Sequence, residues 1–369
     1  MKNAIVIYPV LKNLDKNLIQ NKLTEASNLA EAIFLNVIHK EYFILRKPDP
    51  KALMRKGKIN YFLEIFNEYN FQGKDSILIF AIDISPIQQR NLERIYKIKI
   101  LDKTSLILEI FGERALSKIG KIQVELAHLS WQKSRLVRSW THLERQRGGF
   151  GFLGGPGESQ IELDKRMINK RIKQLRSLIV KVKKIRDIQY NNRQKKRVPV
   201  VSLLGYTNAG KSSLFNSLTK LNISAKNKLF ETLDTKISYF YLPMTKKAYI
   251  NDTVGFISDL PTLLVEAFKS TLDEVIKADL LIHVIDISVS NHEEQKSDVL
   301  NVLKQLSIIP NTLNGPPMIE VINKVDVDKF DNKKLFKNKK NTFLISAKTG
   351  AGIDNLKNEI DKILYSLTV

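Results

Sequence analysis

A glycine-rich octapeptide, which lies between an apolar strand and a helix, constrains the fold of this chain most. It follows the valine-rich run Val198–Leu204, precedes the helical run Ser213–Thr219 and fits the pattern G-x-x-x-x-G-K-[ST]. Glycines let backbone N–H groups converge on phosphate oxygens, and the helix amino terminus adds partial positive charge. We predict that Lys211 reaches the β- and γ-phosphates and that the Ser212 hydroxyl ligates Mg²⁺. The predicted phosphate-binding residues are Gly205, Tyr206, Thr207, Asn208, Ala209, Gly210, Lys211 and Ser212.

The base is predicted from two short motifs further along the chain. The first, Asn323-Lys324-Val325-Asp326, follows the apolar run Met318–Ile322. A carboxylate such as Asp326 accepts from both N1–H and the exocyclic amine of guanine, whereas adenine has no donor at N1. We expect Asn323 to tie this loop to the phosphate loop and the Lys324 stem to cover the base. In the second motif, Ser346-Ala347-Lys348, the Ala347 amide is a candidate donor to guanine O6. The predicted ligand and substrate is therefore GTP.

Two further segments predict how the γ-phosphate and metal are held. Asp252-Thr253-Val254-Gly255 closes the strand Ala248–Ile250 and fits D-x-x-G, so Asp252 would hold Mg²⁺ through water and the Gly255 amide would sense the γ-phosphate. A switch loop is expected at Phe230, Glu231, Thr232, Leu233 and Asp234. Thr232 is our candidate for the second protein hydroxyl on Mg²⁺, with Thr235 as its competitor. The predicted metal ligands are Ser212, Thr232 and Asp252, and the predicted catalytic residues are Lys211, Thr232 and Gly255.

The residue after Gly255 bears on the rate of hydrolysis. Related GTPases often place there a glutamine that orients the attacking water, but this chain has Phe256, whose ring cannot hydrogen-bond a water. We therefore expect slow hydrolysis by the isolated protein and stimulation by a partner. Asn208 could coordinate K⁺, which would supply the positive charge of an arginine finger. A simple loop hydrogen bond is an equally good explanation of this asparagine.

Charge and helical spacing predict a basic hairpin before the nucleotide-binding region. The chain has 369 residues and a formal net charge of +22, which favours polyanionic partners such as nucleic acid. In Leu163–Arg197, 14 Lys and Arg residues accompany only two acidic ones, and apolar residues recur at helical spacing. A similar pattern runs from Ile122 to Leu143, and the glycine-rich segment Gly148–Gly157 separates the two. We predict an antiparallel helical hairpin, although the second helix could simply have a solvated face.

The predicted fold class is α/β. A Ras-like P-loop GTPase domain at 198–369 is preceded by a small α/β unit at 1–110 and by the two-helix hairpin at 111–197, with its tip at 148–157. The chain lacks cysteine, an apolar run of about 18 residues and a secretory signal, so we expect no membrane span and a cytoplasmic protein, with a monomer favoured. We expect Asp273 and Glu274 to lie on a solvated helix face, and His283 to be a satisfied core or strand histidine.

The whole chain resembles the HflX-type GTPases. The specific similarities lie outside the nucleotide motifs, in Lys47–Pro50, Leu78–Asp83, Ser85–Leu92, Asp102–Phe111, Gly120–Ala127 and Gly154–Glu162. The resemblance implies binding to the large ribosomal subunit and its rRNA, and splitting or rescue of ribosomes under stress. It also implies that the glycine-rich tip reaches toward the peptidyl transferase region. The candidate rRNA contacts are Lys165, Arg166, Lys170, Arg171 and Lys173.

A second function remains open at the level of the sequence. The chain could be an RNA-binding ribosome-assembly or storage factor in which GTP acts only as a conformational switch. Some relatives carry a further domain after the position where this chain stops, at Val369, so we expect any contact made by such a domain to be missing.

Overall fold

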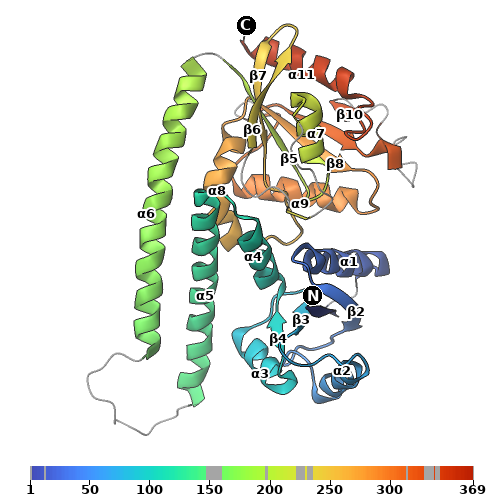
Figure 1. The fold of residues 1–369 in the computed structure, drawn as a ribbon, viewed down its shortest axis with the longest axis vertical. Coiled ribbons are helices and arrows are strands. Elements are labelled where there is room, and N and C mark those ends of the chain that lie inside the picture. Colours follow the sequence, from blue (N-terminus) through green and yellow to red (C-terminus); the bar gives the residue numbers. More distant parts are fainter. Residues whose placement is uncertain are drawn as a thin grey trace. The chain divides into compact units, whose positions relative to one another are not determined.

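Two β-sheets, one in each half of the chain, organise the fold (Figure 1). The computed structural model describes residues 2–11, 14–146, 160–195, 198–221, 229–230, 236–312, 315–327, 336 and 341–368. The chain divides into two compact units, the first made of residues 1–113 and 124–177 and the second of residues 114–123 and 178–369. The α/β fold class predicted from the sequence is confirmed. The predicted hairpin tip, Gly148–Gly157, lies outside the described residues.

The first unit contains a parallel four-stranded sheet with the order β2-β1-β3-β4. Its strands are β1 (Asn3–Val10), β2 (Asn36–Ile44), β3 (Ser76–Phe80) and β4 (Lys99–Leu101). Its helices are α1 (Lys16–Ala32), α2 (Lys56–Glu68), α3 (Pro86–Tyr96) and α4 (Lys103–Arg114). Seven of the eight β1 residues are buried, as expected for a parallel strand covered on both faces. Helices α2 and α4 were not predicted from the sequence.

Helices α5 (Lys118–Gln146) and α6 (Gln160–Lys195) are the two long helices predicted from the sequence. Their residues are shared between the two units, so the three-part division of the chain stays a prediction. Within the first unit, Arg171 on α6 donates to Glu125 on α5, with Nε–Oε1 at 2.7 Å and Nη2–Oε2 at 3.0 Å. Only Ile172 and Leu175 of the predicted apolar stripe on α6 are fully buried in the described part of the chain.

The second unit contains a six-stranded sheet with the order β10-β9-β8-β5-β7-β6, in which only β6 runs antiparallel to its neighbour. Its strands are β5 (Val200–Gly205), β6 (Lys236–Leu242), β7 (Lys246–Asp252), β8 (Leu280–Asp286), β9 (Met318–Asn323) and β10 (Thr342–Leu344). The helical elements are α7 (Lys211–Thr219), α8 (Thr262–Ile276), α9 (His292–Gln305), the single turn η1 (Val325–Val327) and α11 (Ile353–Thr368).

Helices cover both faces of this second sheet. Leu203 packs on the face that carries α7 and α11, and Leu204 packs on the face that carries α8 and α9. Alternate residues of one strand therefore enter separate cores, as the two-residue period of a strand requires. The carboxyl ends of the parallel strands β5, β7, β8 and β9 meet at one edge, where ligands bind in open α/β sheets.

Candidate nucleotide site

The loop after β5 has a backbone that demands glycine at two positions. Gly205 has φ +151°, and a Cβ there would lie 2.3 Å from the Val284 carbonyl oxygen. Gly210 has φ +95°, and its Cβ would lie 2.1 Å from the Asn323 side-chain nitrogen. A side chain at Gly205 would meet β8 and one at Gly210 would meet the end of β9, so close packing as well as conformational freedom explains the predicted pattern.

Lys211 is buried at the start of α7 and turned onto the loop. Its Nζ donates to the carbonyl oxygens of Gly205 at 3.2 Å and Tyr206 at 2.9 Å. Burial lowers the pKa of Lys211 to about 8, and the charge of Asp252 only partly opposes this effect. Loop carbonyls are weak partners for a buried ammonium group. A phosphate placed within the loop would be a stronger one, in agreement with the role predicted for Lys211.

Ser212 and Asp252, two of the three predicted metal ligands, lie in contact with each other. The Ser212 Oγ donates to Asp252 Oδ2 at 2.7 Å, and Asp252 is fully buried at the end of β7. A hydroxyl and a carboxylate are hard oxygen ligands of the kind that Mg²⁺ prefers, so the residues present fit this ion. The third predicted ligand, Thr232, lies outside the described residues, as do Glu231, Leu233, Asp234 and Thr235.

The D-x-x-G segment contacts the phosphate loop directly. A Cβ on Gly255 would lie 2.7 Å from Thr207 Cα and 3.1 Å from Lys211 Nζ. The backbone of Phe256 holds the loop from the other side, because its N–H donates to Gly205 at 3.1 Å and its carbonyl accepts from Thr207 at 2.7 Å. The Thr207 hydroxyl in turn accepts from the backbone N–H of Phe230 at 2.9 Å, which joins the loop to the predicted switch segment.

The remaining residues of this segment are structural. Thr253 donates its hydroxyl to the Leu203 carbonyl at 2.6 Å, and Val254 is buried. The ring of Phe256 is 2% exposed and belongs to the core formed with α8 and α9. The Phe256 side chain therefore takes part in packing. The presence of phenylalanine where related GTPases often have glutamine thus has a structural explanation as well as a catalytic consequence.

Asn323 connects three loops, as the sequence analysis predicted in part. Its side-chain nitrogen donates to the Ala209 carbonyl in the phosphate loop at 2.9 Å, which is the predicted tie. Its side-chain oxygen accepts from the Ala347 amide at 2.9 Å. That amide was our candidate donor to guanine O6, but in this structure it donates within the protein. The contact to O6 therefore stays a prediction.

Lys324 and Asp326 lie beside this link. Lys324 has φ +65°, and its Nζ pairs with Asp286 Oδ2 at 2.6 Å. Asp326 lies on η1 and is exposed. A carboxylate that is to accept from a base has to be accessible in this way. Ser346 is fully buried, while Lys348 is exposed.

Asp286 is a site residue that the sequence analysis missed. It ends β8, and its Oδ1 accepts from the Ser288 N–H at 2.9 Å and hydroxyl at 2.6 Å while Oδ2 holds Lys324. A positioned Lys324 stem is what covering a base requires. The available signal was its position, since Asp286 directly follows the apolar run Leu280–Ile285 and ends β8 as Asp252 ends β7.

The Asn208 side chain is exposed, its φ is +63°, and within the described part of the chain it makes no hydrogen bond.

The prediction that Glu274 lies on a solvated helix face is wrong, because Glu274 is buried and accepts from Asn251 at 3.5 Å. His283 is a buried strand residue as predicted, but Nδ1 has no partner in the described structure, and burial lowers its pKa to about 3.

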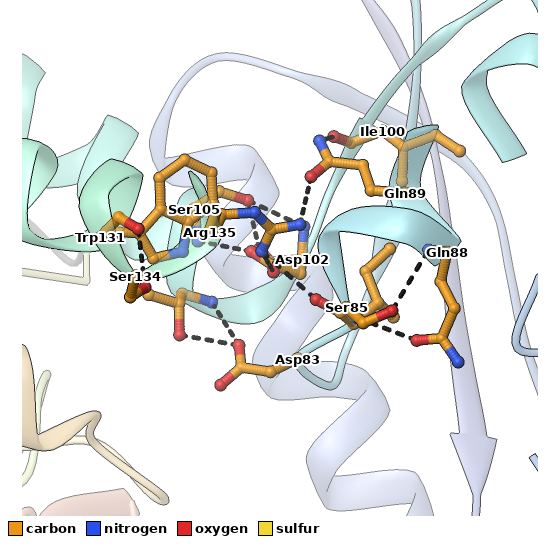
Figure 2. Close-up of polar contacts among 12 residues, drawn as sticks. Asp83, Ser85, Gln88, Gln89, Ile100, Asp102, Ser105, Trp131, Ser134 and Arg135 are labelled. Atoms are coloured by element: carbon orange, nitrogen blue, oxygen red, sulfur yellow. Dashed lines mark hydrogen bonds and ion pairs between the residues drawn. The ribbon is translucent and has the colours of Figure 1, made fainter. Parts of the chain in front are cut away.

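A second polar network lies in the first unit (Figure 2). Arg135 on α5 donates to Asp102 Oδ2 at 2.8 Å and to Gln89 Oε1 at 2.5 Å, and its guanidinium lies 4.5 Å from the centre of the Trp131 ring. Asp83 accepts from the Thr104 hydroxyl at 2.7 Å. The network fixes α5 against α3, β4 and α4, and it contains residues from three of the segments that carried the family resemblance.

A phosphate loop, an Asp252 carboxylate beside Ser212 and an Asn323–Asp326 base loop at one sheet edge define a P-loop GTPase. Comparison with known sequences agrees with this class. Residues 20–112 match the family described as GTP-binding GTPase N-terminal, residues 114–193 match GTP-binding GTPase Middle Region, and residues 200–324 match 50S ribosome-binding GTPase.

Individual relatives define the family. GTPase HflX of Magnetococcus marinus is 40% identical over 362 residues, covering 97% of this chain and 81% of the relative. GTPase HflX of Escherichia coli is 43% identical over 314 residues, covering 84% and 71%. The chain belongs to the HflX family of GTPases and is a GTP-hydrolysing enzyme. A solved complex of SsGBP with GDP supports the fold, with a TM-score of 0.51 and 24% identity over all of both chains.

Proposed function

We propose that this GTPase binds the large ribosomal subunit through rRNA, and that the bound nucleotide controls this binding. The single observation that carries the proposal is the basic surface of α6. Arg166, Lys170 and Lys173 are exposed there, while Lys165 is half-buried. Arg171 is exposed and paired with Glu125. Clustered cations of this kind attract phosphates without regard to base sequence. The family matched by residues 200–324, 50S ribosome-binding GTPase, supports the same partner.

A contact inside the second unit supports control by the nucleotide. Helix α8 begins seven residues after Gly255, and Lys277 follows its last turn. The Lys277 ammonium pairs with Asp187 on α6 and lies 4.9 Å from the centre of the Tyr190 ring. A movement of Gly255 with the γ-phosphate can therefore reach α6 through one helix. We propose that this path changes the affinity of α6 for RNA.

We further propose how the site holds its ligands and acts on them. Ser212, Thr232 and Asp252 would hold Mg²⁺, which supplies charge neutralisation at the β- and γ-phosphates when it is bound. Lys211 would neutralise phosphate charge, and the Gly255 amide would contact the γ-phosphate. Asn208 would hold K⁺, an assignment that equal turnover in KCl and NaCl would refute. Because Phe256 packs in the core, no side chain from this position orients water, and we expect ribosomes to stimulate slow intrinsic hydrolysis.

The finer role that we propose is splitting or rescue of ribosomes under stress by a cytoplasmic monomer. None of the helices in the described part of the chain combines the length and the apolar character needed to cross a membrane. An alternative is an assembly or storage factor that uses GTP only as a switch. A non-hydrolysable GTP analogue distinguishes the two, since unchanged function with this analogue favours the alternative, which needs GTP binding but not hydrolysis.

The test is co-sedimentation with purified large subunits under GTP, GDP and a non-hydrolysable GTP analogue, with GTP turnover measured in parallel. We expect nucleotide-dependent pelleting and faster turnover. The double variant Arg166→Glu/Lys170→Glu should pellet weakly and still bind GTP. Lys304→Glu makes the same kind of charge reversal on the exposed face of α9 and should pellet as the native protein does. Nucleotide-independent pelleting without stimulation would refute the proposal and leave GTP binding intact.

A further inference from the structure

The outer face of the β6–β7 hairpin carries exposed aromatic side chains that the nucleotide site does not use. Residues on β6 alternate between the two faces of the sheet, so Phe240 and Leu242 are buried under α7 and α11. The intervening residues point the other way, and Ile237, Tyr239 and Tyr241 are 40%, 45% and 65% exposed. Because β6 is the last strand of the sheet among the described residues, none of the other described strands screens this face from the side.

Neighbouring side chains on β6 and β7 pack around the ring of Tyr241. Its ring meets the Tyr239 ring edge to face, with centroids 5.6 Å apart and planes 81° apart. Tyr239 is itself covered by the Lys247 ammonium, 4.1 Å from the ring centre. Lys247 is the direct cross-strand partner of Tyr241, and Tyr249 is that of Tyr239. The rings are therefore ordered by one another and by a cation, while the Tyr241 ring remains the most exposed of them.

Apart from Asp252, which is fully buried at the end of β7, the charges on this hairpin are of one sign. Residues 236–251 contain Lys236, Lys246 and Lys247 and no aspartate or glutamate. Asp361 on α11 accepts from the backbone N–H groups of Met244 and Thr245 at 2.8 Å each, so this carboxylate is engaged on the α11 side of the tip. An exposed ring with lysines beside it and no carboxylate between them suits a base stacked on the ring with its phosphate on a lysine.

We propose that Tyr241, supported by Tyr239 and Lys247, is a stacking site for an unpaired base of single-stranded RNA. This face would give the G domain an RNA contact separate from α6. The proposal rests on the proposed function only in taking rRNA as the ligand in the cell, because the stacking itself requires no ribosome. Residues 236–251 carry no carboxylate and Asp252 is buried, which favours RNA over a protein partner, for which apolar rings surrounded by mixed charges would be expected.

Fluorescence anisotropy with a labelled oligouridine of about 12 nucleotides tests the site in the full chain. We expect Tyr241→Val, which keeps a β-branched residue in the strand, to bind roughly 5- to 150-fold more weakly, the range for loss of one stacked base. Tyr241→Phe should bind as the native protein does, since stacking needs the ring alone. Lys247→Gln should lower the slope of log affinity against log salt by about one. Tyr365→Val is the matched control, because Tyr365 on α11 is also exposed, at 47%.

Three outcomes would overturn the proposal. Tyr241→Val could bind RNA normally, or Tyr241→Phe could be as weak as Tyr241→Val, which would assign the contact to the hydroxyl group. Tyr241→Val could also lose large-subunit pelleting while oligouridine binding is unchanged, which would make this face a protein contact. Normal RNA binding by the native chain, with loss in Tyr241→Val, would support the site even if nucleotide-dependent pelleting failed, so this failure is distinguishable from failure of the proposed function.

Discussion

Asn323→Ala tests whether one buried amide assembles the nucleotide site. Asn323 is 2% exposed and satisfies the Ala209 carbonyl in the phosphate loop and the Ala347 amide in the Ser346–Lys348 loop, both at 2.9 Å. Alanine removes both partners at once. The Ala209 carbonyl and the Ala347 N–H are then left buried without them, or the loops move apart to admit water.

The magnitude follows from the two groups left behind. A buried polar group without a partner costs about 1–3 kcal/mol, so two groups cost about 2–6 kcal/mol in the nucleotide-bound state. Part of this cost is lost stability of the free protein. The remainder is paid on binding, when the loops must reassemble around the base. The loss in free energy of unfolding and the loss in free energy of GDP binding should therefore sum to this range.

Denaturant unfolding followed by circular dichroism gives the first loss, and isothermal titration calorimetry with GDP gives the second. Gly210→Ala adds a cross-check, because its Cβ would lie 2.1 Å from the Asn323 side chain. In the Asn323→Ala background that clash is gone, and Gly210→Ala should cost about 0.5–3 kcal/mol less than it does alone. Unchanged stability and GDP affinity in Asn323→Ala, or strictly additive costs in the double variant, would refute this account of the site.

Three further predictions concern other buried groups. GDP affinity should be independent of pH below about pH 8 and fall by up to tenfold per pH unit above it, because the low pKa of Lys211 rises when phosphate binds. Calorimetry across this range would show the fall in affinity. A Lys211→Met variant should bind GDP weakly and with no such pH dependence. Phe256→Gln should lower the free energy of unfolding by about 2–4 kcal/mol without speeding hydrolysis, since an amide replaces a core ring; faster turnover at native stability would contradict this. Arg135→Met should destabilise the protein by about 3–5 kcal/mol because it strands the buried Asp102 charge, whereas Arg171→Met, which removes an exposed pair, should leave the thermal transition unchanged.

The sequence by itself determined the parts of the site whose chemistry is local. Gly205–Ser212 specifies a strand, a loop and a helix start within one short segment, so its phosphate-binding geometry could be predicted without the rest of the chain. The Asn323–Asp326 motif predicted guanine for a similar reason, because the choice of base depends on one carboxylate that accepts from the two donors of guanine. Helical spacing likewise predicted α5 and α6.

Tertiary structure decided what depends on neighbours distant in sequence. Asp286 became a site residue only because β8 lies beside β9, which places its carboxylate against Lys324. Glutamate is usually a surface residue, but Glu274 is buried, since Asn251 from β7 lies under α8. Phe256 could be predicted to be unable to orient water, but not to pack in a core shared with α8 and α9. In each case burial is a property of the assembled sheet and helices, which local sequence pattern does not encode.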